Sequence, residues 1–167
     1  MKNFLMEKTL PATLMFLEPE TGALDCTSYD ISFTIVTEIA GGEDLHAQKL
    51  KQHISFTKLL TVVEAVIDQS VVISAEPDDF YAVAGINNNL IVLPDSTESM
   101  LTMALHSKFN TVVHADTFVD CVRLKNLRDN ISYEYLQTDK ADSDLPTIPE
   151  WLGDFSYWKT PWWHRED

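Results

Sequence analysis

Residues 31–39 show a regular alternation of apolar and polar positions. One side carries Ile31, Phe33 and Ile35, and the other carries Ser32, Thr34 and Val36. A period of two in β-branched and aromatic residues predicts a half-buried strand. The apolar run at 13–17 predicts a second strand, and the Pro and Gly of residues 18–22 predict a turn. These two strands can therefore pair antiparallel.

Two stretches have the spacing of amphipathic helices. In the first, apolar residues recur at i, i+3, i+4, i+7 and i+11, namely Phe56, Leu59, Leu60, Val63 and Ile67. This predicts a helix over residues 55–68, after a shorter helical piece that Asp44 caps and that runs to Lys51. A second helix is predicted after Pro94, with Asp95 or Ser96 as its cap. Its apolar face consists of Met100, Leu101, Ala104 and Leu105.

The remaining predicted strands are short. They cover residues 71–73, 80–84, 90–93, 111–113, 117–124 and 131–136. Turns are predicted at the acidic residues 76–79, at 85–89 and at 128–130. Because helices interrupt the strands without alternating with each one, we expect an α+β fold and not a doubly wound parallel sheet. It would have mainly antiparallel sheet(s) of short strands, two main helices and a Trp-rich C-terminal tail.

The composition changes at Gln137 and predicts three segments. Residues 1–137 form the α+β domain, residues 138–146 an acidic linker, and residues 147–167 an aromatic docking tail. All four tryptophans of the chain lie in this last segment. Thr147 and Glu150 have capping-box spacing, which predicts one helical turn, and Pro161 favours an extended segment after it.

The aromatic side chains of the tail are the candidate partner-binding residues. They are Trp151, Phe155, Tyr157, Trp158, Trp162 and Trp163. Four tryptophans carry about 600–1,000 Å² of surface that avoids water, and soluble monomers rarely expose an apolar patch of that size. Three interpretations stay open: the tail covers a face of its own domain, it contacts a partner or a second copy, or it stacks on a small ligand.

The net charge of −14, from 26 acidic and 12 basic side chains, argues against direct nucleic-acid binding, which needs Lys and Arg. It also argues against an anionic membrane surface, and no apolar run approaches the length of a membrane span. The charge is compatible with solubility alone, with a basic protein partner, or with mimicry of nucleic-acid charge.

The candidate chemistry in the rest of the chain is sparse. Cys26 and Cys121 are far apart, which favours free thiols in a reducing cytoplasm. No histidine pair has zinc-motif spacing, so neither a metal site nor a cofactor is expected. The pair His114 and Asp116 can share one strand face as two ligands or as a base with its orienter, but a solvated or hydrogen-bonded structural pair is the strongly favoured interpretation. The acidic turn formed by Glu76, Asp78 and Asp79 lacks the spacing of a calcium loop.

Three segments together resemble small uncharacterised accessory proteins of tailed bacteriophages: residues 32–38, residues 88–95 and residues 153–163. The resemblance implies a role in binding or blocking a host protein, or in assembling a virion, and brings no catalytic residues with it. The expected function is therefore a non-enzymatic protein-interaction module that docks through its Trp-rich tail, in the host cytoplasm or in the virion. The alternatives are an acidic inhibitor that occupies a nucleic-acid site of a host enzyme, and an oligomeric virion or assembly component.

Overall fold

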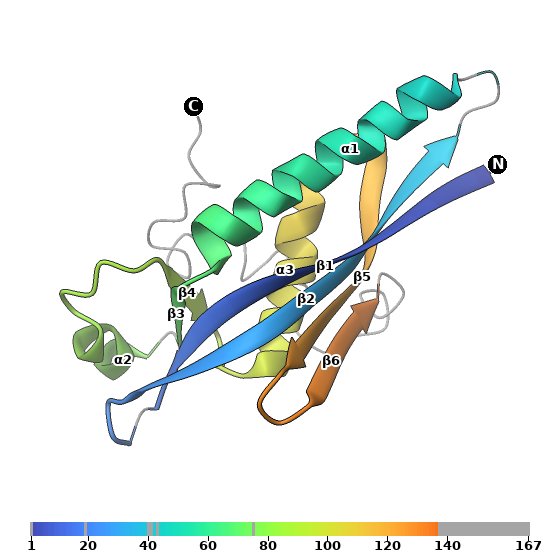
Figure 1. The fold of residues 1–167 in the computed structure, drawn as a ribbon. Helices are drawn as coiled ribbons and strands as arrows, with labels where there is room; N and C mark the ends of the chain where they lie inside the picture. Colours follow the sequence, from blue (N-terminus) through green and yellow to red (C-terminus); the bar gives the residue numbers. More distant parts are fainter. Residues whose placement is uncertain (1, 19, 40–41, 43, 75, 137–167) are drawn as a thin grey trace.

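The computed structural model describes residues 2–18, 20–39, 42, 44–74 and 76–136 (Figure 1). Its elements in chain order are β1 (Lys2–Leu17), β2 (Leu24–Ile39), α1 (Leu45–Val62) with a π-helical turn (Val63–Ile67), β3 (Ser70–Ser74), α2 (Pro77–Ala82), β4 (Leu90–Leu93), α3 (Glu98–Val112), β5 (Thr117–Asn126) and β6 (Ile131–Leu136). The predicted α+β class is confirmed, with α1 and α3 as the two main helices.

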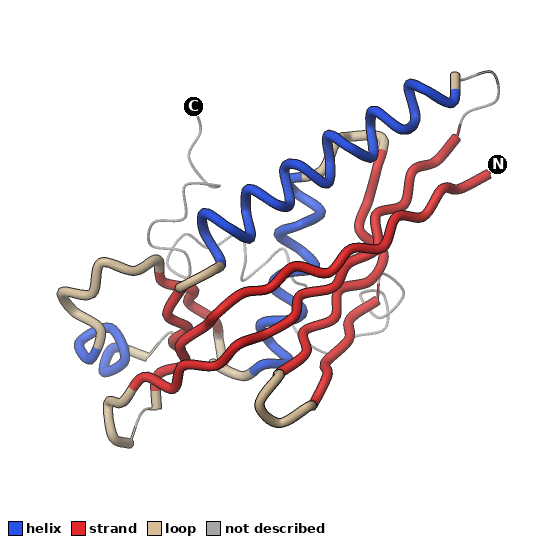
Figure 2. The backbone as a smooth tube through the Cα atoms, in the orientation of Figure 1, coloured by secondary structure: helices blue, strands red, loops and turns tan. Residues whose placement is uncertain are grey.

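The six strands form one sheet in the order β4-β3-β1-β2-β5-β6 (Figure 2). Strands β1, β2, β5 and β6 pair antiparallel, whereas β3 is parallel to both β1 and β4. The prediction of a mainly antiparallel sheet was therefore wrong, because the sheet is mixed. The connection through α2 returns the chain in the same direction between β3 and β4, as parallel pairing requires, whereas β3 reaches the side of β1 after β2 and α1.

The prediction of short strands was also wrong for the first two. They form a hairpin of two 16-residue strands, paired from Lys2↔Ile39 to Leu17↔Leu24. The first half of β1 is largely exposed and contains charged residues and Pro11. It therefore shows no regular apolar alternation from which a strand could be predicted. The turn at residues 18–22 is confirmed: Gly22, at φ +70°, donates its N–H to the Glu18 carbonyl at 2.9 Å.

Three of the predicted helix and strand boundaries need correction. Helix α1 is continuous where two pieces were predicted, although Asp44 caps it as expected, by accepting the His46 N–H at 3.2 Å. Residues 80–84, predicted as a strand, lie largely in α2, since Pro77 and two aspartates provide a helical first turn. Residues 111–113, also predicted as a strand, end α3, and the cap of α3 is Thr97.

Both main helices pack on the same face of the sheet. The Phe33 ring lies between the two helices, 6.4 Å from the Phe56 ring of α1 and 5.7 Å from the Phe109 ring of α3. The alternation predicted for β2 is confirmed here, since Ile31, Phe33 and Ile35 are fully buried. The opposite face carries a second buried cluster at β3 and β4, which includes Val71, Ile73 and Val92. Over β2, β5 and β6 it carries polar, exposed residues such as Arg123 and Glu134.

The predicted linker and aromatic tail lie outside the described residues, so that the boundaries at 138–146 and 147–167 stay predictions. Within the described part of the chain, no helix combines the length and the apolarity that a membrane crossing needs.

Candidate interaction surface

The first half of β1 forms an open edge of the sheet. Strand β3 pairs with β1 only from Leu14 to Phe16, so that among the described residues only β2 pairs with residues 3–11. Thr13 directs its backbone towards the β3 side, because its N–H donates to Asp68 Oδ1 at 2.7 Å and its carbonyl accepts from Gln69 at 2.7 Å. By alternation, Asn3, Leu5, Glu7 and Thr9 present their backbone groups at the open edge. Pro11, which has no N–H to lose, suits this edge.

Helix α1 is held firmly against the sheet beside this edge. Its buried Ser55 hydroxyl bonds to the Thr117 hydroxyl at 2.7 Å and accepts the His114 N–H at 3.0 Å. Leu59 and Val62 continue the buried face into the core. At the edge of this contact, the Lys51 ammonium pairs with the Asp116 carboxylate at 2.9 Å. The helix therefore presents its outer face in a fixed orientation.

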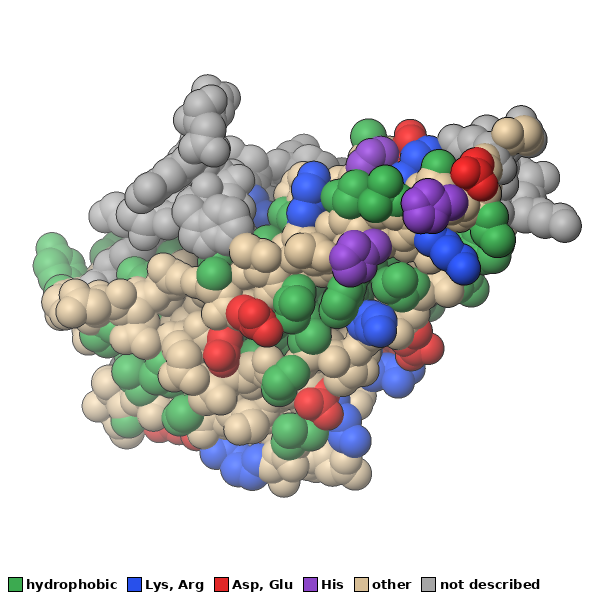
Figure 3. All heavy atoms as spheres, turned by 45° about the horizontal axis from the view of Figure 1, so that its top comes forward, with side chains coloured by type: hydrophobic (Ala, Val, Ile, Leu, Met, Phe, Trp, Pro, Cys, Tyr) green, Lys and Arg blue, Asp and Glu red, His purple; other side chains and the backbone are tan. Residues whose placement is uncertain are grey.

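The outer face of α1 is basic, in contrast to the protein as a whole. Three lysines, two histidines and no Asp or Glu occupy the 18 residues of the helix, although the chain has a net charge of −14. At 100° per residue, the exposed His46, Lys49, Leu50, His53 and Thr57 fall on one stripe. Figure 3 shows histidine and lysine side chains gathered over this helix.

Exposed apolar side chains occur on both α1 and β1, where by alternation Phe4 faces α1, as Lys8 does, and Leu5 faces the other side of the sheet. Leu45 and Leu50 of α1 are 52% and 51% exposed, and Phe4 and Leu5 of β1 are 41% and 68% exposed. These four are half of the eight large apolar side chains exposed among the described residues. The Lys8 ammonium lies 5.2 Å from the centre of the Phe56 ring and so joins the strand to the helix. We call the surface of residues 3–11 of β1 and 45–58 of α1 the arm (Figure 1).

The predicted pair of His114 and Asp116 does not form a base with its orienter. Both residues lie in the loop before β5 and not in a strand. The Nδ1 atom of His114 accepts the backbone N–H of Asp116 at 3.1 Å, and the carboxylate of Asp116 is 4.0 Å from it. That carboxylate instead bonds to Lys51, which lowers the pKa of Asp116 below its ordinary value. The pair is structural and helps to fix α1.

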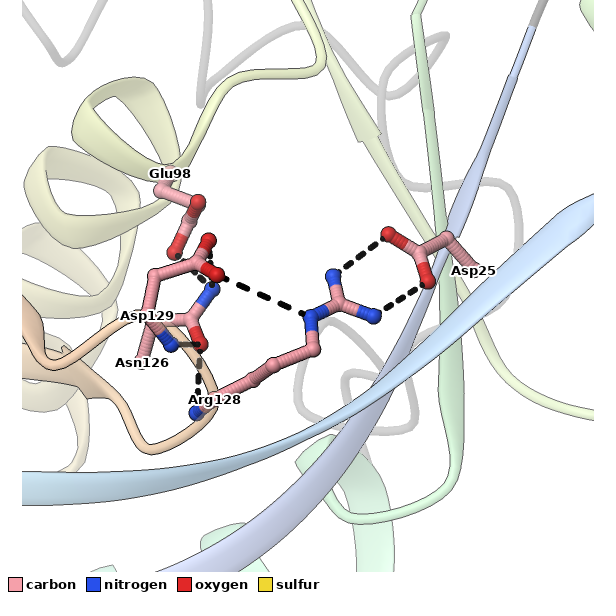
Figure 4. Close-up of polar contacts among 5 residues, drawn as sticks. All are labelled: Asp25, Glu98, Asn126, Arg128 and Asp129. Atoms are coloured by element: carbon pink, nitrogen blue, oxygen red, sulfur yellow. Dashed lines mark hydrogen bonds and ion pairs between the residues drawn. The ribbon is translucent and has the colours of Figure 1, made fainter.

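At the opposite end of the sheet, a closed polar network joins three elements (Figure 4). Arg128, in the β5–β6 turn, donates two hydrogen bonds to Asp25 of β2 at 2.9 and 2.8 Å. The buried Asn126 accepts the N–H groups of Arg128 and Asp129 at 2.9 and 3.1 Å, and donates to Glu98 of α3 at 3.3 Å. We call this network the loop end. The polar groups of its members are hydrogen-bonded to one another, which is typical of a network with a structural role.

A small hollow of about 20 Å³ opens on the polar face of the sheet, with Glu7, Thr34, Cys121 and Arg123 in its lining. The thiol of Cys121 donates to Glu134 Oε1 at 3.1 Å. Burial, and then the Glu134 carboxylate, raise the pKa of Cys121 to about 12. The thiol therefore stays protonated at neutral pH and is a poor nucleophile.

The acidic residues 76–79 do not form an ion site. Asp79 is buried and accepts the N–H and the hydroxyl of Ser74 at 3.1 and 2.6 Å, which makes it a structural cap between α2 and β3. Within the described ranges, no three His, Cys, Asp or Glu side chains are grouped as a metal site requires. The candidate residues Trp151, Phe155, Tyr157, Trp158, Trp162 and Trp163 lie outside the described residues.

The arm was not predicted from the sequence. The absence of acidic residues in α1 is visible in the sequence and indicates an unusual helix in so acidic a chain. The open edge has no such sign, because it depends on where β3 begins to pair with β1.

No protein-family model and no curated protein matches the chain. Among solved structures, it is similar to the 6-pyruvoyl tetrahydropterin synthase of Caenorhabditis elegans, at 13% identity and a TM-score of 0.49, over 81% of this chain and 96% of that one. It is also similar to an uncharacterized protein of Wolinella succinogenes, at 12% identity and a TM-score of 0.47, over 82% of this chain and 99% of that one. Likenesses this distant say nothing about what this chain binds.

Proposed function

We propose that this protein is a non-enzymatic protein-interaction module, of the accessory type found in tailed bacteriophages, that docks through its Trp-rich tail. The observation that carries the proposal is the arm, where an open strand edge lies beside four exposed large apolar side chains. Proteins usually cover or blunt such an edge, since it templates pairing with another chain.

The chemistry of the described residues favours binding over catalysis. Outside the arm, the polar clusters at the loop end, at Asp116 and at Asp79 are each closed by hydrogen bonds within the chain. The aromatic tail supplies the residue type that dominates binding energy in protein interfaces. In this proposal the tail is the ligand segment, and its partner is a protein.

The test replaces Trp158 and Trp162 by alanine in the full chain, with Tyr81→Ala as the matched control. Tyr81 is an aromatic side chain that is 80% exposed on α2, away from the arm. Capture of partners from host lysate and the mass by light scattering are measured for each protein. We expect the double variant to lose the bound protein or the self-association that the wild-type chain and Tyr81→Ala retain. If the folded double variant binds as the wild type does, the proposal is wrong.

A further inference from the structure

We propose that the arm is the receptor for the acidic aromatic tail of the same chain, with residues 151–160 adding as an extra strand along the open edge of β1. The inference rests on the proposed function, because both assign docking to the Trp-rich tail. The inference adds that this tail covers the arm. Three independent features of the molecule support it: the backbone of the edge, the charge of the two surfaces, and the reach of the linker.

The backbone of the edge fits a strand of this length. Within the part of the chain that the structure describes, no strand pairs with the outward N–H and carbonyl groups of residues 3–9. An extended peptide can bond to such groups, as in other cases of strand addition. In the tail, residues 151–160 lie between Pro149 and Pro161 and contain no proline themselves. When extended, this segment places Trp151, Phe155 and Tyr157 on one side. That side matches the apolar surface of Phe4 and Leu45.

The charges of the two surfaces are opposite. Helix α1 has three lysines and no acidic residue, and Lys8 adds a fourth cation beside Phe56. Residues 138–167 contain seven acidic and three basic side chains. The docking segment 151–160 itself carries one Asp and one Lys, and the negative charge lies in its flanks, at residues such as Asp144, Glu150 and Asp167. These flanks are complementary to a basic helix.

The register of the sheet brings the tail within reach. Leu136, at the end of β6, pairs with Cys121, which lies opposite Thr34, and Thr34 pairs with Glu7 in the middle of the open edge. Leu136 and Glu7 are therefore separated by three inter-strand spacings, about 14 Å in all. The nine residues 138–146 span up to about 30 Å when extended. The tail can therefore cross the sheet and reach the edge of its own chain.

Tryptophan fluorescence tests the inference directly, because every tryptophan of the full chain lies in the tail. Glu7→Pro removes one N–H from the open edge without removing a bond to β2. It also removes a negative charge, which by itself would favour an acidic tail. Lys49→Glu reverses a charge on the exposed face of α1. Leu127→Ser is the matched control, since Leu127 is 45% exposed in the β5–β6 turn, at the loop end.

We expect the wild-type emission to lie at the short wavelengths of buried tryptophan and to be protected from acrylamide. Glu7→Pro and Lys49→Glu should each shift the emission to longer wavelength and remove the protection, with thermal unfolding confirming that both are folded. Leu127→Ser should leave the emission unchanged. High salt should shift the wild-type emission in the same direction as Lys49→Glu, because it screens the attraction between the two surfaces.

Two results would overturn the inference: wild-type tryptophans that are already exposed, or a protected emission that neither arm variant changes. If the tail variant of the previous subsection still loses its partner in that case, the proposed function stands without the inference. If it also binds normally, both fail. A protected emission that is lost on dilution, together with a doubled mass in light scattering, would assign the site to the tail of a second copy and overturn docking within one chain.

Discussion

The arm and the loop end lie at opposite ends of the same β1–β2 hairpin and differ in how far each is closed. At the loop end, five polar side chains from three elements bond to one another, and the guanidinium of Arg128 is fixed by two hydrogen bonds to one carboxylate. In the arm, by contrast, β2 is the one described strand that pairs with β1, whereas β3 also pairs with it from Leu14 to Phe16. Four large apolar side chains are exposed there.

Whether a group has a partner distinguishes structural residues from candidate binding residues more clearly than residue type does. The charged side chains at the loop end each have a structural partner within the chain. Leucine and phenylalanine of the arm are residue types typical of a core, yet no described element covers them. A binding surface is therefore best sought where the fold leaves groups unsatisfied.

The largest effect should come from removing the side chain that supports both main helices. Phe33 is 1% exposed and contacts Phe56 and Phe109, so Phe33→Ala should lower the free energy of unfolding by about 3–5 kcal/mol. Phe4→Ala, in the arm, is the matched control, because Phe4 is 41% exposed. Urea unfolding measures both. Equal losses would mean that the full chain buries Phe4 as deeply as the two helices bury Phe33.

How well the sequence predicted each region follows from the range of the interactions. Alternation in β2 and the stripe of α1 depend on neighbours along the chain, and both were predicted. The first half of β1 was missed because its pairing with β2 buries only one of its faces, and only partly. Residues 80–84 were assigned to a strand from their apolar character, but Pro77 and the caps around Asp79 favour a helix. The site was less predictable, since an open edge depends on distant strands.

A smaller loss should follow from opening the loop end. Asn126 is 2% exposed, and its amide satisfies two backbone N–H groups and the Glu98 carboxylate. Asn126→Ala leaves these groups without a partner, which should cost about 1–3 kcal/mol of stability. Asn3→Ala, at the exposed start of the open edge, should change stability by less than about 0.5 kcal/mol. Chemical denaturation of the two variants tests this, and a neutral Asn126→Ala would contradict the structural role of the network.

The smallest effect should be the pH dependence of the two ion pairs, one at each end of the molecule. The hydrogen bonds from Arg128 lower the pKa of Asp25, and Lys51 lowers the pKa of Asp116. A carboxyl whose pKa is lower in the folded state stabilises the protein above its unfolded pKa of about 3.9, and this contribution is lost as the pH falls through the lowered value.

Asp25→Asn and Asp116→Asn should therefore reduce the thermal midpoint at pH 7, and their difference from the wild type should disappear at acid pH, below the lowered pKa values. The loss should be larger for Asp25→Asn, because Asp25 receives two bonds from one guanidinium whereas Asp116 receives one from a lysine. Thermal unfolding from pH 2 to pH 7 measures both. A larger loss for Asp116→Asn would mean that the pair that fixes α1 holds the fold more tightly than the loop end does, and would reverse the ranking of the two ends.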